Sequence, residues 1–429
     1  MRKYIGVFVL LITAVLCIGG YEETSAVENN SVAITKENFP DKRIREKISK
    51  AFDKNKDMSL SEEEIKAAKK LELRESYFGE NATYDLQGIS KLKYVTTLIV
   101  EAGVLKNVLE ITKMPQLGCL EISTTQRRAS LDLRNNVNLV DLDLFLVEVK
   151  ELPRSGKLRS LELESCELEK VALVDFPELR KVSLAYCDYQ TLTIKNCPKL
   201  EKIIGEENNQ LKKVILKNLP ELTRLTMEST KKLKKLSLSK LPNLESIYIE
   251  EAKHLRTLAL PRLPELRKLK IGDNAIKKLN LKKLPRLREF CIWGNKEIKV
   301  LDLRPLRKLN KLVWKRGKLK KIKFGEKKNL EYIYVSHNQL GGTWKLSKFP
   351  RLLDFECNYN KIKNIYASKH KCLQELICEH NRLRELDLYY IEPLVLRFRG
   401  NPHVTAYLYS KRATKYFKYR FDKSAKVYY

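Results

Sequence analysis

Six prolines return through the middle of this chain at nearly constant intervals of 21, 22, 22, 22 and 21 residues: Pro177, Pro198, Pro220, Pro242, Pro264 and Pro285. Each opens a phrase in which leucine or isoleucine recurs, as in the segment Leu219-Pro220-Glu221-Leu222. A period near 22 residues predicts a solenoid, because a unit of this length can bury its apolar stripe only against the next unit. The expected molecule is therefore a long slab with two broad surfaces.

Each unit contains two extended segments. The first alternates apolar and variable residues, as in Ile247-Tyr248-Ile249, which places one face in the core and the other in solvent. The second follows about eight residues later, as in Leu255, Leu258 and Leu260. Fifteen such units fit between residues 71 and 401. The predicted fold class is an α/β-type solenoid dominated by β-structure, with a small helical cap before the repeats.

An asparagine or cysteine stands three residues past the first segment in many units. An amide at such a bend can bond the unpaired backbone groups there and stack into a buried ladder. The positions are Cys166, Cys187, Asn208, Asn274, Asn295, Asn338, Asn360, Asn381 and Asn401.

With this position the units resemble the short leucine-rich repeats of secreted and surface proteins of bacteria. The segments Phe355-Glu-Cys-Asn-Tyr-Asn360-Lys-Ile362 and Leu376-Ile-Cys-Glu-His-Asn381-Arg-Leu383 carry the resemblance most clearly. It implies a curved slab on the order of 70 Å long, from rungs about 4.8 Å apart. It also implies a binding protein whose function lies in its variable surface positions.

The first residues predict export. Met1-Arg2-Lys3 precedes an apolar run from Tyr4 to Gly19 and the small residues Thr24-Ser25-Ala26, so residues 1–26 are expected to be a cleaved signal peptide. The alternative is lipidation at Cys17, which the bulky Leu16 before it disfavours. A linker is expected over 27–38, and no later segment is apolar enough to span a membrane. The predicted location is secreted or at the cell surface.

Residues 39–70 resemble the EF-hand-type cap that precedes such repeats in secreted bacterial proteins. The twelve residues from Asp53 to Glu64 fit the calcium loop, and Ser61 with Glu64 forms a capping box for the second helix. The resemblance implies weak calcium binding by Asp53, Asn55, Asp57, Ser59, Ser61 and Glu64. Met58 departs from the pattern, since the sixth position needs φ > 0 and a non-glycine residue there costs about 1 kcal/mol. The alternative is a metal-free helix-loop-helix that closes the end of the core.

The net charge of +31 is expected to divide the molecule into two faces. Solvent positions of the first segments are mixed or acidic and include an aromatic group, Tyr248, Trp293, Tyr332 and Tyr334. Lysines collect beside the second segments as a lysine ridge, comprising Lys212, Lys213, Lys234, Lys235, Lys277, Lys278, Lys320 and Lys321. Such a ridge either solubilises a long sheet edge or concentrates extended polyanions. Aromatic and basic residues lie on different faces, which argues against nucleic acid.

The last segment, 402–429, breaks the repeat and alternates aromatic and basic residues, as in Tyr407-Leu-Tyr409. A strand pair that covers the final rung is the leading interpretation, and an adhesive tail is the alternative.

No motif for catalysis stands out. The sequence has no phosphate loop, nucleotide fingerprint or HExxH motif. His337 and His380 are two rungs apart, too far to share a metal ion. Cys291 is expected on a solvent-facing position without a histidine to activate it, and Cys166 and Cys187 are expected as core thiols without a disulfide.

The leading functional hypothesis is an exported recognition protein, not an enzyme, that binds a protein or peptide ligand through the aromatic group. The alternative is a wall-associated structural or adhesion factor that binds an anionic wall polymer or glycan through the lysine ridge.

Overall fold

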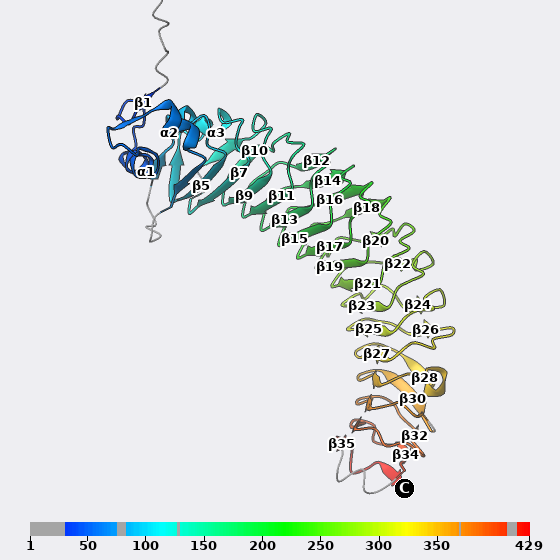
Figure 1. Ribbon diagram of the computed structural model, residues 1–429. Coiled ribbons are helices and arrows are strands. Elements are labelled where there is room, and N and C mark those ends of the chain that lie inside the picture. The colour runs from blue at the N-terminus through cyan, green and yellow to red at the C-terminus, as the bar shows by residue number, and fades with distance from the viewer. Residues whose placement is uncertain (1–30, 75–82, 127–128, 369, 410–417) are drawn as a thin grey trace, which may run out of the picture.

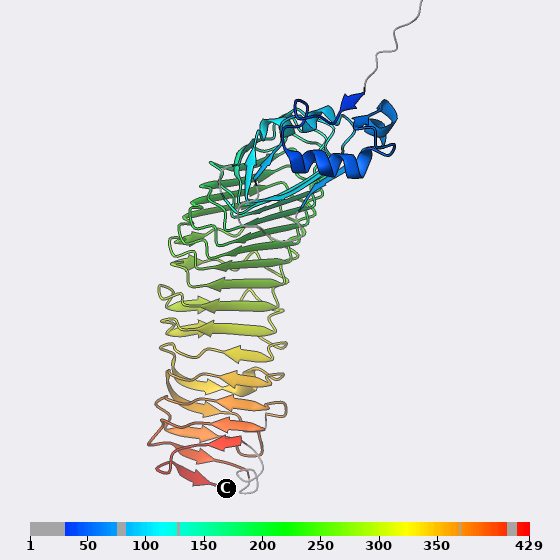
Figure 2. The same cartoon turned by 90° about the vertical axis from the view of Figure 1, so that its left-hand side faces the viewer.

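The computed structural model describes residues 31–74, 83–126, 129–368, 370–409 and 418–429. These residues form an arch of parallel β-turns with a small helical cap at its N-terminal end (Figure 1). Seventeen inner strands line the concave side as one continuous parallel sheet (Figure 2). They are β3 (Lys70–Leu73), β5 (Thr97–Ala102), β7 (Cys119–Thr124), β9 (Asp141–Phe145), β11 (Ser160–Glu164), β13 (Lys181–Ala185), β15 (Lys202–Glu206), β17 (Arg224–Glu228), β19 (Ser246–Glu250), β21 (Lys268–Gly272), β23 (Glu289–Trp293), β25 (Lys311–Lys315), β27 (Tyr332–Tyr334), β29 (Asp354–Glu356), β31 (Glu375–Ile377), β33 (Val395–Arg397) and β35 (Lys418–Arg420).

The convex side carries shorter strands that pair only in separate groups. Two-stranded, four-stranded and five-stranded sheets follow one another without joining. The strands are β4 (Thr83–Asp85), β6 (Val104–Lys106), β8 (Ser130–Asp132), β10 (Glu148–Glu151), β12 (Val171–Val174), β14 (Thr191–Lys195), β16 (Lys213–Lys217), β18 (Lys235–Ser239), β20 (Thr257–Leu258), β22 (Lys278–Leu279), β24 (Val300–Asp302), β26 (Lys321–Lys323), β28 (Gly341–Lys345), β30 (Lys361–Tyr366), β32 (Glu385–Asp387), β34 (Thr405–Tyr407) and β36 (Lys426–Tyr428).

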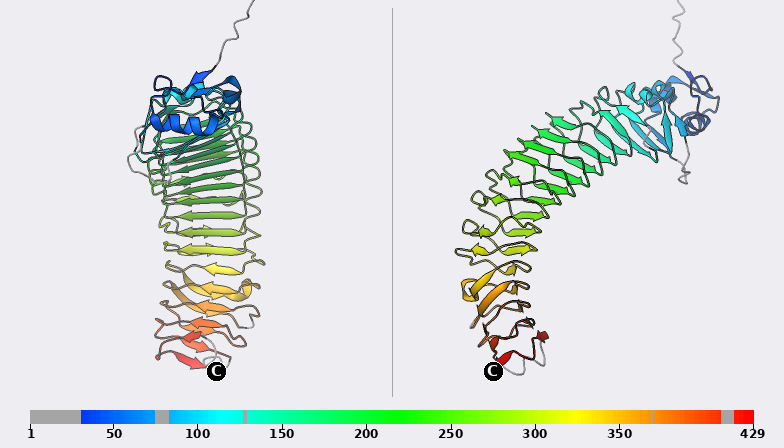
Figure 3. Two further views of the ribbon diagram at one scale, coloured as in Figure 1. Left: turned by 60° about the vertical axis from the view of Figure 1, so that its left-hand side comes forward. Right: turned by 180° about the vertical axis from the view of Figure 1, so that it is seen from behind.

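This difference between the two sides produces the curvature. Hydrogen bonds hold the inner strands at the spacing of a parallel sheet, about 4.8 Å. The interrupted outer side has no such constraint, so successive rungs spread there and the slab bends around the inner sheet (Figures 1 and 3). The predicted β-solenoid is confirmed, with sixteen inner strands from β3 to β33 where the sequence indicated fifteen units.

The core is the column of apolar residues between the two sides. In β19, Ile247 and Ile249 are fully buried, while Tyr248 between them faces the concave surface. Each fully buried leucine or isoleucine contributes about 1.5 to 3 kcal/mol, but only because the next rung covers it. The bend after each inner strand uses left-handed backbone at non-glycine residues, with φ +54° at Tyr186 and +51° at Glu207.

The asparagine ladder is present at this bend. The Asn338 side chain donates to Trp314 O over 2.7 Å and accepts from Leu319 N over 3.0 Å. Cys166 and Cys187 take the same place in their rungs as free buried thiols. Burial and the bond to Cys166 raise the pKa of Cys187. These side chains satisfy the carbonyls of the preceding rung.

The N-terminal cap consists of α1 (Lys42–Phe52) and α2 (Glu62–Ala67), joined by a loop. The remaining elements near it are β1 (Val32–Ala33), β2 (Ser59–Leu60), the 3-10 helix η1 (Ile89–Lys91) and α3 (Leu109–Thr112), and a second 3-10 helix, η2 (Leu346–Lys348), follows β28. Helix α1 buries Ile44, Ile48 and Phe52 against the first rungs, and the predicted capping box of Ser61 and Glu64 begins α2. Strand β1, in the segment expected as a linker, pairs with β2 inside the loop.

At the other end, residues 418–429 continue the solenoid. Strand β35 pairs in parallel with β33, and β36 pairs in parallel with β34. They cover the preceding rung as the sequence suggested, but as a further turn of the repeat.

Candidate functional site

The predicted aromatic group lies on the concave sheet between β19 and β27. Tyr248, Trp293, Tyr332 and Tyr334 are all half-buried and point away from the core, since the residues next to them in each strand are buried. The structure divides them into two clusters on either side of β25. Both belong to the same continuous surface.

The first cluster is built around Glu250 at the end of β19. The rings of Tyr248 and Trp293 are 6.1 Å apart, the Tyr248 hydroxyl donates to Glu250, and Trp293 Nε1 donates to Glu250 Oε1 over 3.1 Å. Trp293 reaches β19 from β23 by crossing Gly272 of β21, whose missing side chain leaves room for the indole. Burial, followed by Glu250, raises the pKa of Tyr248. The indole is thus fixed flat over three strands.

The second cluster pairs tyrosines with lysines. The rings of Tyr332 and Tyr334 are 6.3 Å apart on β27. Lys311 Nζ on β25 lies 5.7 Å and 5.5 Å from the two ring centres, and Lys315 Nζ lies 5.2 Å from that of Tyr334. Cation–π contacts of this kind hold both the rings and the amines in place.

Carboxylates of β29 complete the second cluster on its other side. Tyr334 Oη donates to Asp354 Oδ2 over 2.9 Å, and Lys315 Nζ bonds Glu356 Oε2 over 2.8 Å. Burial and the neighbouring Asp354 raise the pKa of Tyr334. Positive groups on β25, aromatic rings on β27 and negative groups on β29 therefore lie in successive strands.

An acidic zone occupies the same face nearer the N-terminus. Glu121, Asp143 and Glu162 are in register on β7, β9 and β11. Burial, followed by the charges of Glu162 and Glu121, raises the pKa of Asp143. Like charges in adjacent strands repel one another. This zone has no aromatic residue among its three carboxylates and lies apart from the aromatic group.

The lysine ridge lies on the convex side, along one edge of the outer strands. Lys213 on β16 is in register with Lys235 on β18. In the six rungs from β16 to β26 the residue before the outer strand is basic and solvent-exposed, and the described residues form no ion pair with any of them. These residues are Lys212, Lys234, Arg256, Lys277, Lys299 and Lys320. The two predicted surfaces are thus on opposite sides of the slab.

The predicted calcium loop is a tight turn closed by its own side chains. Met58, at the sixth position, has φ +63°, the left-handed conformation expected there. Asp53 accepts from Asp57 N and Met58 N over 3.2 Å and 3.1 Å, and Ser59 N donates to Asp57 Oδ1 over 2.8 Å.

The other oxygens of this loop also have protein partners. Asn55 Nδ2 donates to Asp57 Oδ2, and Glu64 accepts from Lys54 N over 2.7 Å and from Ser61 N over 2.9 Å. These bonds lower the pKa of Glu64, with the Ser61 backbone contributing most. Across the part of the chain that the structure describes, no three histidine, cysteine or acidic residues are arranged to hold a metal ion. The donor set is not assembled in this conformation, and calcium binding stays a prediction.

The expectation that Cys291 faces solvent is wrong. Its side chain lies on the concave side of β23, but it is only 7% exposed because longer neighbours cover it. Burial raises the pKa of the thiol. Cys291 is therefore a covered thiol rather than a nucleophile.

His337 and His380 are separated by Tyr359, as their spacing of two rungs requires. Each imidazole stacks on the Tyr359 ring at 4.4 Å between centres. The three rings fill the gap through which the histidines could have met, so they form a packed column at the bend.

A group of exposed tyrosines at the C-terminal end was only partly visible in the sequence. Tyr407 on β34 stacks on Tyr428 of β36 with ring centres 5.6 Å apart, and Tyr389 meets Tyr390 edge to face at 4.3 Å. Parallel pairing brings together tyrosines 21 residues apart, a spacing that alternation within one segment does not reveal. Residues 410–417, also part of the expected aromatic tail, lie outside the described residues.

Comparison with known proteins bears on the fold. The PEPR1–AtPEP1 structure matches at a TM-score of 0.51 with 17% identity, covering 84% of this chain and 52% of that chain. This likeness joins the 21 to 22 residue rung, the parallel strands and the asparagine ladder. The fold is a leucine-rich repeat solenoid.

Two bacterial proteins match at lower TM-scores. The functional domain of InlJ from Listeria monocytogenes gives 0.45 with 16% identity, covering 83% of this chain and 82% of that chain. YopM from Yersinia enterocolitica gives 0.38 with 16% identity, covering 94% and 97%. No family model and no curated protein matches the sequence. Within the described ranges, no helix of this repeat protein is long and apolar enough to cross a membrane.

Proposed function

We propose that this leucine-rich repeat chain is an exported recognition protein that binds a protein or peptide ligand on its concave face between β19 and β29. The observation that carries the proposal is the second cluster, where Tyr332 and Tyr334 stand between lysines and carboxylates. Half-buried aromatic rings held by polar neighbours contribute large contact area at little entropic cost on binding. The PEPR1 structure, which shares the fold, contains AtPEP1.

The charges of this cluster define what the ligand should present. Lys311 and Lys315 on β25 favour a carboxylate, whereas Asp354 and Glu356 on β29 favour a basic group. A ligand that crosses the strands should therefore carry opposite charges on either side of an apolar or aromatic residue. Because the two sets of charges are three strands apart at most, the span is about 10 Å.

Export is part of the proposal. The basic start, the apolar run and the small residues at 24–26 support it, and residues 1–30 lie outside the described residues. The test is the N-terminal residue and location of the protein in its producing cell. Cleavage after Ala26 with release to the medium or surface supports export, and retention of Met1 inside the cell contradicts it.

The binding test is a double variant, Tyr332→Ala with Tyr334→Ala, used to capture partners from bacterial-surface and host extracts. We expect capture to fall at least tenfold relative to the parent chain. Tyr186→Ala is the matched control, since Tyr186 is 55% exposed on a bend outside the site. Equal thermal unfolding must accompany the loss. Unchanged capture by the folded double variant would remove this site from consideration.

A second candidate function is the binding of an anionic wall polymer or glycan by the lysine ridge. Its support is the unbroken column of exposed basic residues over six rungs, which does not exchange ion pairs with the described surface around it. A contact of this kind weakens steeply between about 50 and 200 mM salt, whereas the aromatic site barely responds.

The matched variants for the ridge differ only in where charge is removed. Lys212, Lys234, Lys277 and Lys320 are changed to glutamine in one protein, and the exposed lysines Lys231, Lys232, Lys253 and Lys318 in the other. Loss of binding to purified wall polymer only in the first supports the ridge. Equal effects in both would mean that net charge alone is responsible.

A further inference from the structure

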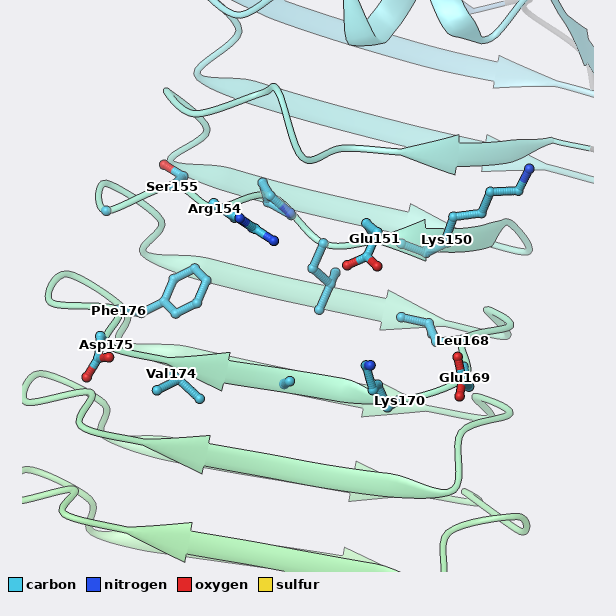
Figure 4. A pocket seen from close by; sticks show the side chains of 15 residues that line it. Lys150, Glu151, Arg154, Ser155, Leu168, Glu169, Lys170, Val174, Asp175 and Phe176 are labelled. Carbon is cyan, nitrogen blue, oxygen red and sulfur yellow. The ribbon is translucent and has the colours of Figure 1, made fainter.

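The outer sheet is interrupted by an open groove between β10 and β12 (Figure 4). Strand β10 pairs only with β8, and β12 pairs only with β14. No backbone hydrogen bond among the described residues joins 150–156 to 169–176. Two strand edges therefore face each other without a strand between them.

A short rung produces this groove. Asp141 on β9 pairs with Ser160 on β11, only 19 residues later, whereas Ser160 pairs with Lys181 after 21 residues. The missing residues fall on the convex side, where the chain crosses directly from Glu151 to Ser155. Pro153 in this crossing has no N–H to offer a neighbouring strand. The rung cannot form an outer strand long enough to cover β12.

The uncovered edge of β12 presents backbone groups to the groove. Asp175 N donates to Lys195 O, on the side of β14. Hydrogen-bonding direction alternates along a parallel strand, so Ala172 and Val174 direct their N–H and C=O groups the opposite way, into the groove. Both side chains are solvent-exposed, with Val174 41% exposed.

The groove is large enough and apolar enough for a ligand. Its volume is about 560 Å³, within the range of about 300 to 1,000 Å³ common for binding pockets. Leu152, Leu168 and Phe176 line its floor, and the last two are otherwise buried in the core. Figure 4 shows Arg154, Asp175 and Phe176 at one end and Lys150, Glu169 and Lys170 at the other. Acidic and basic groups balance at the rim, so the site demands no net charge.

We propose that this groove binds an extended peptide segment, which adds to the free edge of β12 through main-chain hydrogen bonds. Alternate side chains of the segment point to the floor, so those that contact Leu168 and Phe176 are apolar. The argument for this occupant is the backbone itself, since only another strand satisfies a row of N–H and C=O groups spaced along an edge. The site is on the convex face and does not depend on the proposed concave function.

The probe is a capped, fluorescein-labelled peptide of five alternating valine and threonine residues, titrated by anisotropy. We expect saturable binding to the whole chain. N-methylation of the alternate amides on one edge of the peptide should weaken binding at least tenfold, because those groups can no longer donate. Equal binding by the methylated peptide would overturn main-chain pairing.

The protein variant that tests the edge is Val174→Pro. Its N–H faces the groove and not β14, so proline removes one groove donor and is tolerated as on other edge strands. We expect about a tenfold loss of peptide binding with unchanged thermal unfolding, and Val174→Ala, which keeps the N–H, should bind like the parent chain. Equal binding by Val174→Pro and Val174→Ala overturns the proposal.

Two further measurements exclude other occupants. The Tyr332→Ala/Tyr334→Ala variant should retain peptide binding, and its loss there would place the peptide on the concave face. Sedimentation of the parent chain should show no dimer that Val174→Pro abolishes. Such a dimer would show that the groove is covered by a second copy of the chain and would overturn the peptide as its occupant.

Discussion

The indole of Trp293 lies directly on the backbone of Gly272, one rung away. A Cβ atom built on Gly272 would fall 2.2 Å from Cε2 of Trp293, closer than any real contact. Gly272 does not have a positive φ. The glycine is therefore required by its neighbour and not by its own backbone.

Gly272→Ala should displace Trp293 from its bond with Glu250. We expect a shift in tryptophan fluorescence and a loss of about 1 to 3 kcal/mol in the free energy of unfolding, as for overpacking elsewhere. Gly118→Ala is the control, because its nearest neighbour would be 3.7 Å away. An unshifted emission spectrum in Gly272→Ala would show that the indole can move without consequence.

Lys327→Leu should stabilise the chain at neutral pH. Lys327 is 1% exposed and takes the core position that Leu306 and Phe349 occupy in the adjacent rungs. Its Nζ donates only to Glu326 O over 3.0 Å, and burial lowers the pKa of Lys327 to about 8. The folded state therefore holds this proton less tightly than the unfolded state.

The sign of the pH dependence follows from that lowered pKa. Below pH 8 the charged amine destabilises the fold by roughly 3 kcal/mol, and this cost disappears as pH rises from about 8 to the ordinary value of 10.5. Urea unfolding from pH 7 to 10.5 should show this rise in the parent chain relative to Lys327→Leu. Lys308→Leu, at an exposed position one rung earlier, should keep the rise; a parallel pair of curves for parent and Lys327→Leu contradicts the prediction.

Asn360→Ala should lower the free energy of unfolding by about 2 to 4 kcal/mol. The side chain donates to Val335 O over 2.9 Å and accepts from Leu340 N over 2.9 Å, and both groups are buried. Alanine leaves them without partners, which costs more than the bonds themselves contribute. Chemical denaturation measures the effect, with the exposed Asn329→Ala as control. A difference below about 0.5 kcal/mol between the two would mean that water replaces the amide.

Calcium should stabilise the cap if the oxygens of Asp53, Asp57 and Glu64 turn from their present partners to an ion. Stability would then rise by about 1.4 kcal/mol at ten times the dissociation constant, and Met58→Gly should tighten binding by relieving its positive φ. Hydrogen exchange should show added protection in residues 40–100 and little around Leu269, because repeats couple mainly to neighbours. Asp53→Ala should erase the response, and exchange unchanged by millimolar calcium means a metal-free cap.

The repeat could be predicted because its signal is local and recurs. Alternation as in Ile247, Tyr248 and Ile249 determines which side chains face the core, and the period stacks them. The pairing of β1 with β2 could not be predicted in this way, since Val32 and Leu60 are distant in sequence and two-residue strands have no periodic signal. The continuation into β36 was hidden because the last segment lacks the leucines of the repeat.

The candidate site was predicted in part. The sequence indicated that Tyr332 and Tyr334 face outward, but their contacts with Lys311 and Asp354 depend on the register of three strands. Cys291 was misplaced because alternation gives the direction of a side chain and not the size of its neighbours. The groove beside β12 was missed because a two-residue shortening near Pro153 has its effect only where the next rung fails to find a partner.

The contrast between an unbroken inner sheet and an interrupted outer one also determines how the arch responds to force. Its concave face is inextensible, because lengthening it would break inter-strand hydrogen bonds along seventeen strands. The convex face is compliant, since its gaps can narrow without breaking any bond. Tension between the two ends would therefore flatten the arch about the inner sheet while the spacing of Tyr248, Trp293 and Tyr334 stays constant. A ligand that reads the spacing would remain bound under load, whereas one that fits the curvature would be released.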